Sequence, residues 1–147
     1  MKYLDWPPIW AVLCVFLSWM FAQFLPIVDL SGFYASWLWI LLLVVAFIYI
    51  IWAEVEFLRH KTTVIPRRSA SALLTTGPFK ISRNPIYTGY ALIILSIALK
   101  LGSLSAFLPL PFFVWIITMR FIIGEEAALL KVFGNEYSEW SQNTRRW

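Results

Sequence analysis

The sequence has one cysteine, one histidine and few charged residues, and each shortage excludes a class of protein. Cys14 cannot form a disulfide within the chain, and one cysteine with one histidine cannot supply a typical zinc site, so we expect no bound metal. Charged residues make up 14% of the chain, against roughly 25% in soluble domains. Too few polar groups remain to cover a water-exposed surface. We therefore expect one integral membrane domain over residues 1–147, with Cys14 as an inert packing or lipid-facing residue.

Basic residues are missing from most of the first half of the chain. No Lys or Arg occurs between Lys2 and Arg59, and six then occur from Arg59 to Arg83. Cations gathered in one loop do not form the extended basic surface of a nucleic-acid-binding protein, so the net charge of +4 does not indicate nucleic acid. The pattern is typical of a cytoplasmic loop. For Arg67 and Arg68, binding of anionic lipid headgroups and a role in a functional site are both open.

Four long apolar segments predict membrane-spanning helices over about residues 8–25, 37–58, 85–101 and 105–123. The first resembles a secretory signal, but it is long and lacks a small-residue cleavage site, which indicates a retained span. Asn84-Pro85 specifies the start of the third, because Asn is a favoured N-cap and Pro a favoured first helical residue. Pro109 and Pro111 are expected to kink the fourth or delay its regular part.

The remaining segments carry most of the polar residues. Residues 59–84 form a basic loop, and residues 125–147 form an amphipathic segment that we expect at the membrane interface, after the fourth span and broken at Gly134-Asn135. One face of that segment is predicted to be apolar and aromatic, with the charged residues elsewhere: Leu129, Phe133, Tyr137 and Trp140. The expected fold is all-α, with about four transmembrane helices, both termini in the cytoplasm and this C-terminal segment covering the site.

Glu54 and Glu56 lie at the end of the second span, where two interpretations stay open. Glu56 and His60 are four residues apart and could simply pair at the interface. In the alternative, one of the carboxylates faces a functional site.

Two polar clusters are predicted to meet at the cytoplasmic face, because the third span begins where the fourth one ends. The start of the third helix, with Lys80 and Arg83, favours a carboxylate or phosphate. Glu125 and Glu126 favour an ammonium group or ribose hydroxyls. Aromatic rings suited to a cation or a purine come from Phe79, Tyr87, Tyr137 and Trp140. S-adenosylmethionine carries a carboxylate, an ammonium group, a sulfonium and adenosine, and would use all three sets.

The motif Arg83-Asn84-Pro85-Ile86-Tyr87-Thr88-Gly89, followed by Glu125-Glu126, resembles the signature of the isoprenylcysteine carboxyl methyltransferase and phospholipid methyltransferase superfamily. The likeness covers about residues 50–147, with Gly77-Pro78-Phe79 before the motif and Phe133-Gly134-Asn135-Glu136-Tyr137 and Arg145-Arg146-Trp147 after it. It implies an integral membrane fold whose cytoplasmic end encloses S-adenosylmethionine, with an acceptor that enters laterally from the membrane.

Residue types and resemblance together predict cofactor contacts from Gly77, Phe79, Lys80, Arg83, Asn84, Pro85, Tyr87, Gly89, Glu125 and Glu126. The predicted catalytic residues, which would orient an acceptor, are Tyr137, Arg145 and Arg146. For the two arginines, as for Arg120, anchoring at the interface is the alternative. Many family members have histidine at the position of Asn84. The contact from the histidine ring nitrogen to the cofactor is then either replaced by the Asn84 amide or lost, and Asn84 could also serve only as the N-cap of the helix.

We therefore predict methyl transfer from S-adenosylmethionine to a hydrophobic acceptor (an isoprenylcysteine-like carboxylate, a lipid, a thiol or an amine). The size fits a small bacterial or archaeal enzyme of the cytoplasmic membrane, in contact with membrane lipids. A four-span exporter is the alternative from another class, but it predicts an acid buried within a span, and three of the four spans have no Asp or Glu. A non-catalytic scaffold also stays open, whereas a nicotinamide-dependent sterol reductase would need a dinucleotide motif that we do not find.

Overall fold

The structure is a computed structural model that describes residues 6–32, 36–61 and 71–147. In these ranges the α-helices are α1 (Pro7–Phe24), α2 (Leu38–Arg59), α3 (Pro85–Leu101), α4 (Pro109–Ile117), α5 (Ile123–Phe133) and α6 (Asn135–Asn143). They are joined in part by two 3₁₀ turns, η1 (Gly77–Lys80) and η2 (Leu104–Phe107), and by a π-helical turn, η3 (Thr118–Ile122). No β-sheet occurs among the described residues, so the all-α prediction is confirmed. Arg67 and Arg68, the candidate lipid contacts, lie outside those residues.

Within the described ranges, three helical stretches are long and apolar enough to cross a membrane: Pro7–Phe24, Leu38–Arg59 and Leu104–Phe133. A shorter apolar helix, Pro85–Leu101, accompanies them. Large apolar side chains are exposed along these helices, among them Val12 and Phe16 on α1 and Phe47 and Ile48 on α2. Such an extensive apolar surface requires lipid around it, and the protein is an integral membrane protein.

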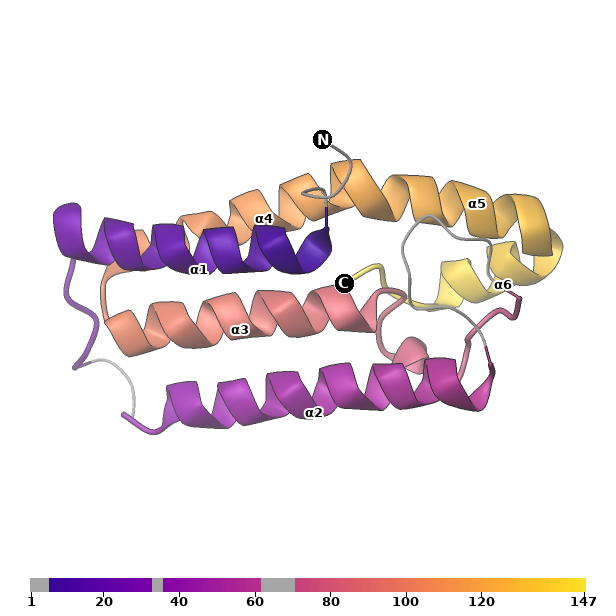
Figure 1. Ribbon diagram of the computed structural model, residues 1–147, viewed down its shortest axis with the longest axis horizontal. Helices are drawn as coiled ribbons and strands as arrows, with labels where there is room; N and C mark the ends of the chain where they lie inside the picture. Colours follow the sequence, from indigo (N-terminus) through magenta and orange to yellow (C-terminus); the bar gives the residue numbers. More distant parts are fainter. Residues whose placement is uncertain (1–5, 33–35, 62–70) are drawn as a thin grey trace.

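Helix α3 lies in the middle of the bundle (Figure 1). Helices α1 and α4 pack on one side of α3, and α2 packs along its other side. The buried stripe of α1 includes the small residues Ala11, Cys14 and Ser18, which recur every three or four residues and let α1 approach its neighbours closely. Cys14 is fully buried in the core, in agreement with an inert packing role.

A glycine sets the distance between α2 and α3. A Cβ added at Gly89 would overlap Cγ1 of Ile50 and lie 2.9 Å from its Cδ1. Across the same interface, the Ser96 hydroxyl donates a hydrogen bond of 2.8 Å to the carbonyl of Trp39. Gly89 therefore faces α2, and its contacts fix the place where α3 begins.

The last apolar segment differs from the prediction. Helix α4 begins at Pro109 after η2, which agrees with the delay expected from the prolines. No break follows at Gly124, however, because the helical stretch runs from Leu104 to Phe133. At 1.5 Å per residue it is about 45 Å long, and the bilayer core is about 30 Å thick. Helix α5 thus continues α4 and η3 as one helical stretch, which extends beyond the bundle (Figure 1).

Local energetics explain this continuation. Glycine inside a helix costs only about 1 kcal/mol relative to alanine, and the residues after Gly124 are strong helix formers. The predicted break at Gly134 is confirmed, since this residue has a φ of +53° and α6 follows it. Helix α6 turns back toward the bundle, which brings the end of the chain to the start of α3 (Figure 1).

Gly89→Ala should lower the free energy of unfolding by about 1–3 kcal/mol, because the new methyl group meets Ile50 in a packed interface. Gly124→Ala is the matched control, since a Cβ there has nothing within 4 Å and alanine favours the helix by up to about 1 kcal/mol. Denaturant unfolding in mild detergent measures both. Equal effects of the two substitutions would contradict the close α2–α3 contact.

Candidate active site

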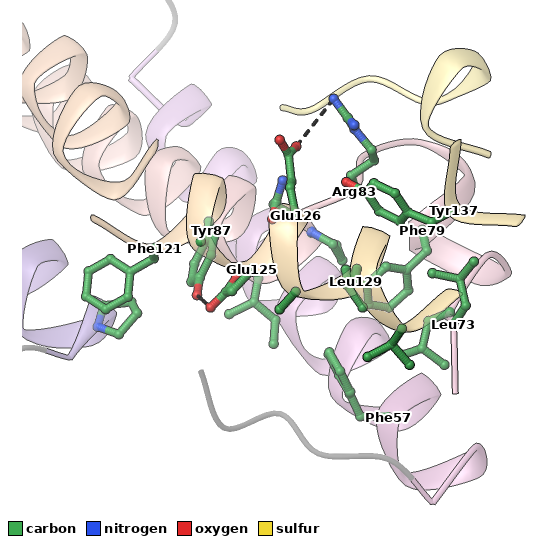
Figure 2. A pocket seen from close by; sticks show the side chains of 18 of the residues that line it. Phe57, Leu73, Phe79, Arg83, Tyr87, Phe121, Glu125, Glu126, Leu129 and Tyr137 are labelled. Carbon is green, nitrogen blue, oxygen red and sulfur yellow. Dashed lines mark hydrogen bonds and ion pairs between the residues drawn. The ribbon is translucent and has the colours of Figure 1, made fainter. Parts of the chain in front are cut away.

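A cavity of about 940 Å³ opens at the end of the bundle where α3 begins. Its walls come from the starts of α1 and α3, the end of α2, η1, the π-helical turn η3, α5 and α6. Figure 2 shows this cavity with side chains from these elements around it. Among the predicted residues, its lining includes Phe79, Arg83, Asn84, Pro85, Tyr87, Glu125, Glu126, Tyr137 and Trp140. The two polar clusters of the sequence therefore do meet at one end of the molecule.

Glu126 is the centre of an ion cluster. Both of its carboxylate oxygens accept hydrogen bonds from the Arg146 guanidinium, from Nε at 3.0 Å and from Nη2 at 2.7 Å. Nη2 of Arg83 lies 3.4 Å from Oε1 of the same carboxylate, and both of these side chains are only 16% exposed. The hydrogen bonds to Glu126 raise the pKa of Arg146 above its ordinary value. The cluster joins α5, the start of α3 and the end of the chain (Figure 2 shows Arg83 and Glu126).

Glu125 is bound from the other side of the cavity. The buried Tyr87 of α3 donates a hydrogen bond of 2.8 Å from its hydroxyl to Oε1 of Glu125. Both glutamates follow η3, in which the Ile123 N–H bonds to the Thr118 carbonyl five residues earlier. The extra residue in a π-helical turn rotates all later side chains by about 100° relative to an uninterrupted α-helix. This turn therefore decides which side chains of α5 face α3.

The segment Thr144–Trp147 runs beside the start of α3. Ser82 and Arg145 form an isolated parallel bridge, in which the Arg83 N–H donates to the Arg145 carbonyl at 2.8 Å. The indole N–H of Trp147 donates to the Thr118 hydroxyl in η3 at 3.2 Å. The end of the chain is thus bound to the two elements that carry the polar clusters.

Three buried polar atoms at the cavity lack a hydrogen-bond partner. In the described part of the chain, the buried side-chain atoms without one are Ser18 Oγ, Arg83 Nε, Tyr137 Oη and Trp140 Nε1. Three of these four belong to residues that line the cavity. Each is able to donate, and a buried donor without a partner is costly, so these three residues are candidates for binding a ligand with acceptor groups.

The phenol of Tyr137 stays protonated at neutral pH. Burial raises its pKa and the charge of Glu126 raises it further, whereas the positive charges of Arg83 and Arg146 and the closeness of the Arg83 guanidinium to the hydroxyl lower it by less. The ring is 5% exposed and packs against Trp140 with ring centroids 5.8 Å apart. Tyr137 is therefore a neutral donor in the wall of the cavity.

The rest of the lining is mostly apolar. Phe57 of α2 and Phe79 of η1 meet edge to face, with centroids 5.4 Å apart. Leu73 and Phe57 lie on the side of the cavity away from Glu126 (Figure 2). Sequence reasoning missed Phe57 and Leu73, because an apolar residue at the end of a span or in the loop after it gives no signal of whether it faces lipid, protein or a cavity.

Five predicted site residues lie outside the cavity lining among the described residues: Gly77, Lys80, Gly89, Arg145 and Arg146. A Cβ added at Gly77, whose φ is +57°, would lie 2.9 Å from Oε1 of Glu56. Lys80 and Arg145 are exposed, and Arg146 reaches the site only through Glu126. Arg120, for which the sequence left open a role in orienting an acceptor or in anchoring at the interface, does line the cavity and lies over the Trp10 ring at 5.6 Å.

Glu56 is 5% exposed and forms a hydrogen bond with the segment that precedes η1. Its Oε2 accepts a hydrogen bond of 3.0 Å from the Thr76 hydroxyl. The predicted Glu56–His60 pair is confirmed, with His60 Nδ1 3.5 Å from the same oxygen. Because the described lining of the cavity does not include Glu54 or Glu56, the structure favours pairing at the helix end over a role facing the site.

Tyr87→Phe and Tyr137→Phe should affect stability differently, although both rings are buried. Loss of the Tyr87 hydroxyl removes a hydrogen bond to a carboxylate and should lower the free energy of unfolding by about 1–3 kcal/mol. Loss of the Tyr137 hydroxyl removes a buried group without a partner and should leave this free energy unchanged or raise it. Denaturant unfolding of the ligand-free protein checks both, and a clear loss for Tyr137→Phe would show that its hydroxyl already has a partner.

Comparisons with known proteins give the family. A search of curated proteins and a search of solved structures each returned no match. The model of a family described as phospholipid methyltransferase matches residues 34–136, more than half of the 147 residues. Members of that family are membrane enzymes that take a methyl group from S-adenosylmethionine, which favours the enzyme over the exporter and the scaffold. The chain therefore belongs to the phospholipid methyltransferase family and is an S-adenosylmethionine-dependent membrane methyltransferase.

Proposed function

We propose that the cavity at the start of α3 binds S-adenosylmethionine together with the head of a lipid-like acceptor, and that methyl transfer takes place there. One observation carries the proposal. Three buried donors without partners, on Arg83, Tyr137 and Trp140, belong to the lining of one cavity whose remaining wall is largely apolar.

The size and the donor set fit this cofactor. Small-molecule sites usually enclose roughly 300–1,000 Å³, and a cavity of about 940 Å³ is near the upper end of that range. It leaves room for part of a second ligand. The guanidinium of Arg83 suits a carboxylate, and the Tyr137 hydroxyl and the Trp140 indole N–H suit further acceptor oxygens or nitrogens. The rings of Phe79, Tyr137 and Trp140 offer faces for a purine.

The two glutamates receive different roles. Glu126 is bound by two guanidinium groups, so we assign it to orienting Arg83. Glu125 lines the cavity and accepts a hydrogen bond from the Tyr87 hydroxyl, and we assign its carboxylate to the cationic part of the cofactor. When bound, S-adenosylmethionine supplies a methyl group on a cationic sulfonium. The protein then has to orient donor and acceptor and keep water out, for which an enclosed apolar wall is suited.

The acceptor is proposed to be a lipid or lipid-like molecule of the membrane. Apolar side chains on Phe57 and Leu73 continue the cavity away from the ion cluster (Figure 2). Trp6 and Pro8, at the start of α1, are exposed and also line it, which gives an apolar approach from the bilayer. We assign Tyr137 to the boundary between cofactor and acceptor, and Arg146 to support of Glu126 rather than to the acceptor itself.

The site is proposed to face the cytoplasm. Arg59, Lys61, Lys80 and Arg83 gather at the end of the bundle that carries it, whereas Lys100 lies at the end of α3 on the opposite side. This asymmetry follows the positive-inside rule. We further propose that α3 is the fourth span, since it runs beside the others through the middle of the bundle (Figure 1). Helix α6 would then lie at the cytoplasmic surface over the site.

Calorimetric titration with S-adenosylhomocysteine tests the cofactor site. Trp140→Phe keeps an aromatic ring but removes the indole donor, and should weaken binding by about 2- to 10-fold. Lys80→Gln is the matched control, because Lys80 is exposed and outside the described cavity lining, and should bind as the unaltered protein does. Unchanged binding in Trp140→Phe, or an equal loss in Lys80→Gln, would place the cofactor elsewhere.

Leu73→Trp should impair methylation of the acceptor without weakening binding of the cofactor. The larger ring fills the apolar part of the cavity, away from Glu126, so methylation of added membrane lipids should fall by at least about 10-fold. The dissociation constant for S-adenosylhomocysteine should stay within about twofold. Transfer of a radiolabelled methyl group to extracted lipids gives the first quantity and calorimetry the second. Full methylation by Leu73→Trp would exclude this side of the cavity as the acceptor path.

A further inference from the structure

Asn84 has a partner that its sequence position does not suggest. It is the N-cap residue of α3, but its side chain makes no capping hydrogen bond. Its Nδ2 instead donates to the main-chain carbonyl of Arg146 at 2.9 Å. The Ser82 hydroxyl donates to the same carbonyl at 3.2 Å. Two side chains near the start of α3 thus bind a single peptide group that is 64 residues from Ser82 and 62 residues from Asn84 in the chain.

The bonds around this carbonyl close into a ring. The Arg146 main chain is held by Asn84, and the Arg146 guanidinium holds both oxygens of Glu126. Glu126 in turn lies 3.4 Å from Nη2 of Arg83, which is the residue next to Asn84. The ring contains four residues from three parts of the chain, and its last member carries the buried Nε that has no partner among the described residues.

Such a ring sets both position and charge. Without Arg146, the carboxylate of Glu126 would be balanced by Arg83 alone and would draw that guanidinium toward itself. With Arg146 bound through two hydrogen bonds, the Arg83 guanidinium is shared with a carboxylate that is already neutralised, and its buried Nε has no partner among the described residues. The position of Arg146 depends in turn on its main chain, and Asn84 provides the shorter of the two side-chain bonds to its carbonyl.

We propose that Asn84 is a positioning residue, which acts on the cofactor through Arg146 and Glu126 rather than by touching it. The proposal rests on the proposed function, because it needs the cofactor to bind beside Arg83. It differs from two other roles for this amide, a direct contact to the cofactor and a side-chain cap of α3. The amide suits the role because it presents an N–H donor to a carbonyl, which an aspartate at this position would repel.

A double-mutant cycle measured by calorimetry with S-adenosylhomocysteine separates these roles. Asn84→Ala should weaken binding by about 3- to 10-fold in the otherwise unaltered protein. Arg146→Gln should weaken it by at least as much. In the Arg146→Gln background, Asn84→Ala should add less than about a twofold loss, because the guanidinium that Asn84 positions is absent.

Hydrogen exchange of the ligand-free protein gives a readout that does not involve the cofactor. The Arg83 amide, which donates to the Arg145 carbonyl, reports whether residues 144–147 are docked. Asn84→Ala should speed its exchange by at least about fivefold, and Lys80→Gln should leave it unchanged. Unaltered exchange in Asn84→Ala would overturn the proposal, and so would its failure to weaken binding.

Equal losses from Asn84→Ala in both backgrounds would show a direct contact to the cofactor and would also overturn the proposal. Failure of the proposed function looks different. In that case the unaltered protein binds S-adenosylhomocysteine but Trp140→Phe and Arg146→Gln bind it equally well, whereas exchange at Arg83 still responds to Asn84→Ala.

Discussion

The carboxylate of Glu126 connects three parts of the chain that are far apart in sequence. It lies on α5, accepts both hydrogen bonds of the Arg146 fork and faces Arg83 at the start of α3. One guanidinium alone would not offset the cost of removing this partly buried carboxylate from water. The arrangement is therefore stable only when α5, the start of α3 and the end of the chain are all in place. The walls of the cavity depend on the same condition, because α5, α6 and the start of α3 form most of its polar side.

This ion cluster can form because close packing fixes the distances between the helices that carry it. Gly89 lets α2 and α3 approach until Ile50 touches the backbone of α3, and the small residues of α1 have a similar role on the other side. The π-helical turn then rotates α5 so that Glu125 reaches Tyr87 and Glu126 reaches Arg83. In lipid, where burial of apolar surface does not drive helices together, close packing and polar bonds of this kind carry the association.

The cavity also joins two kinds of surface that suit two kinds of ligand. Its charged and donor-rich side lies under α5 and α6, and its apolar side continues toward α2 and the start of α1. A methyl donor is charged and water-soluble, whereas a lipid-like acceptor stays in the bilayer. In the proposed function, the charged wall binds the methyl donor and the apolar wall binds the acceptor, so both reach a common point without either crossing an unfavourable medium.

The sequence by itself determined the membrane class, the apolar helices, the break at Gly134 and the meeting of the two polar clusters, because hydropathy, proline and glycine act locally. Composition also changes at Gly124, but only the structure showed that the helix continues through this residue, since one glycine before strong helix formers does not end a helix. Only the tertiary structure decided that Asn84 bonds to Arg146, that Gly89 faces α2 and that Phe57 and Leu73 line the cavity. These depend on the rotation of α5 and on the docking of residues 144–147. Such contacts between distant segments leave no periodic signal in a single sequence.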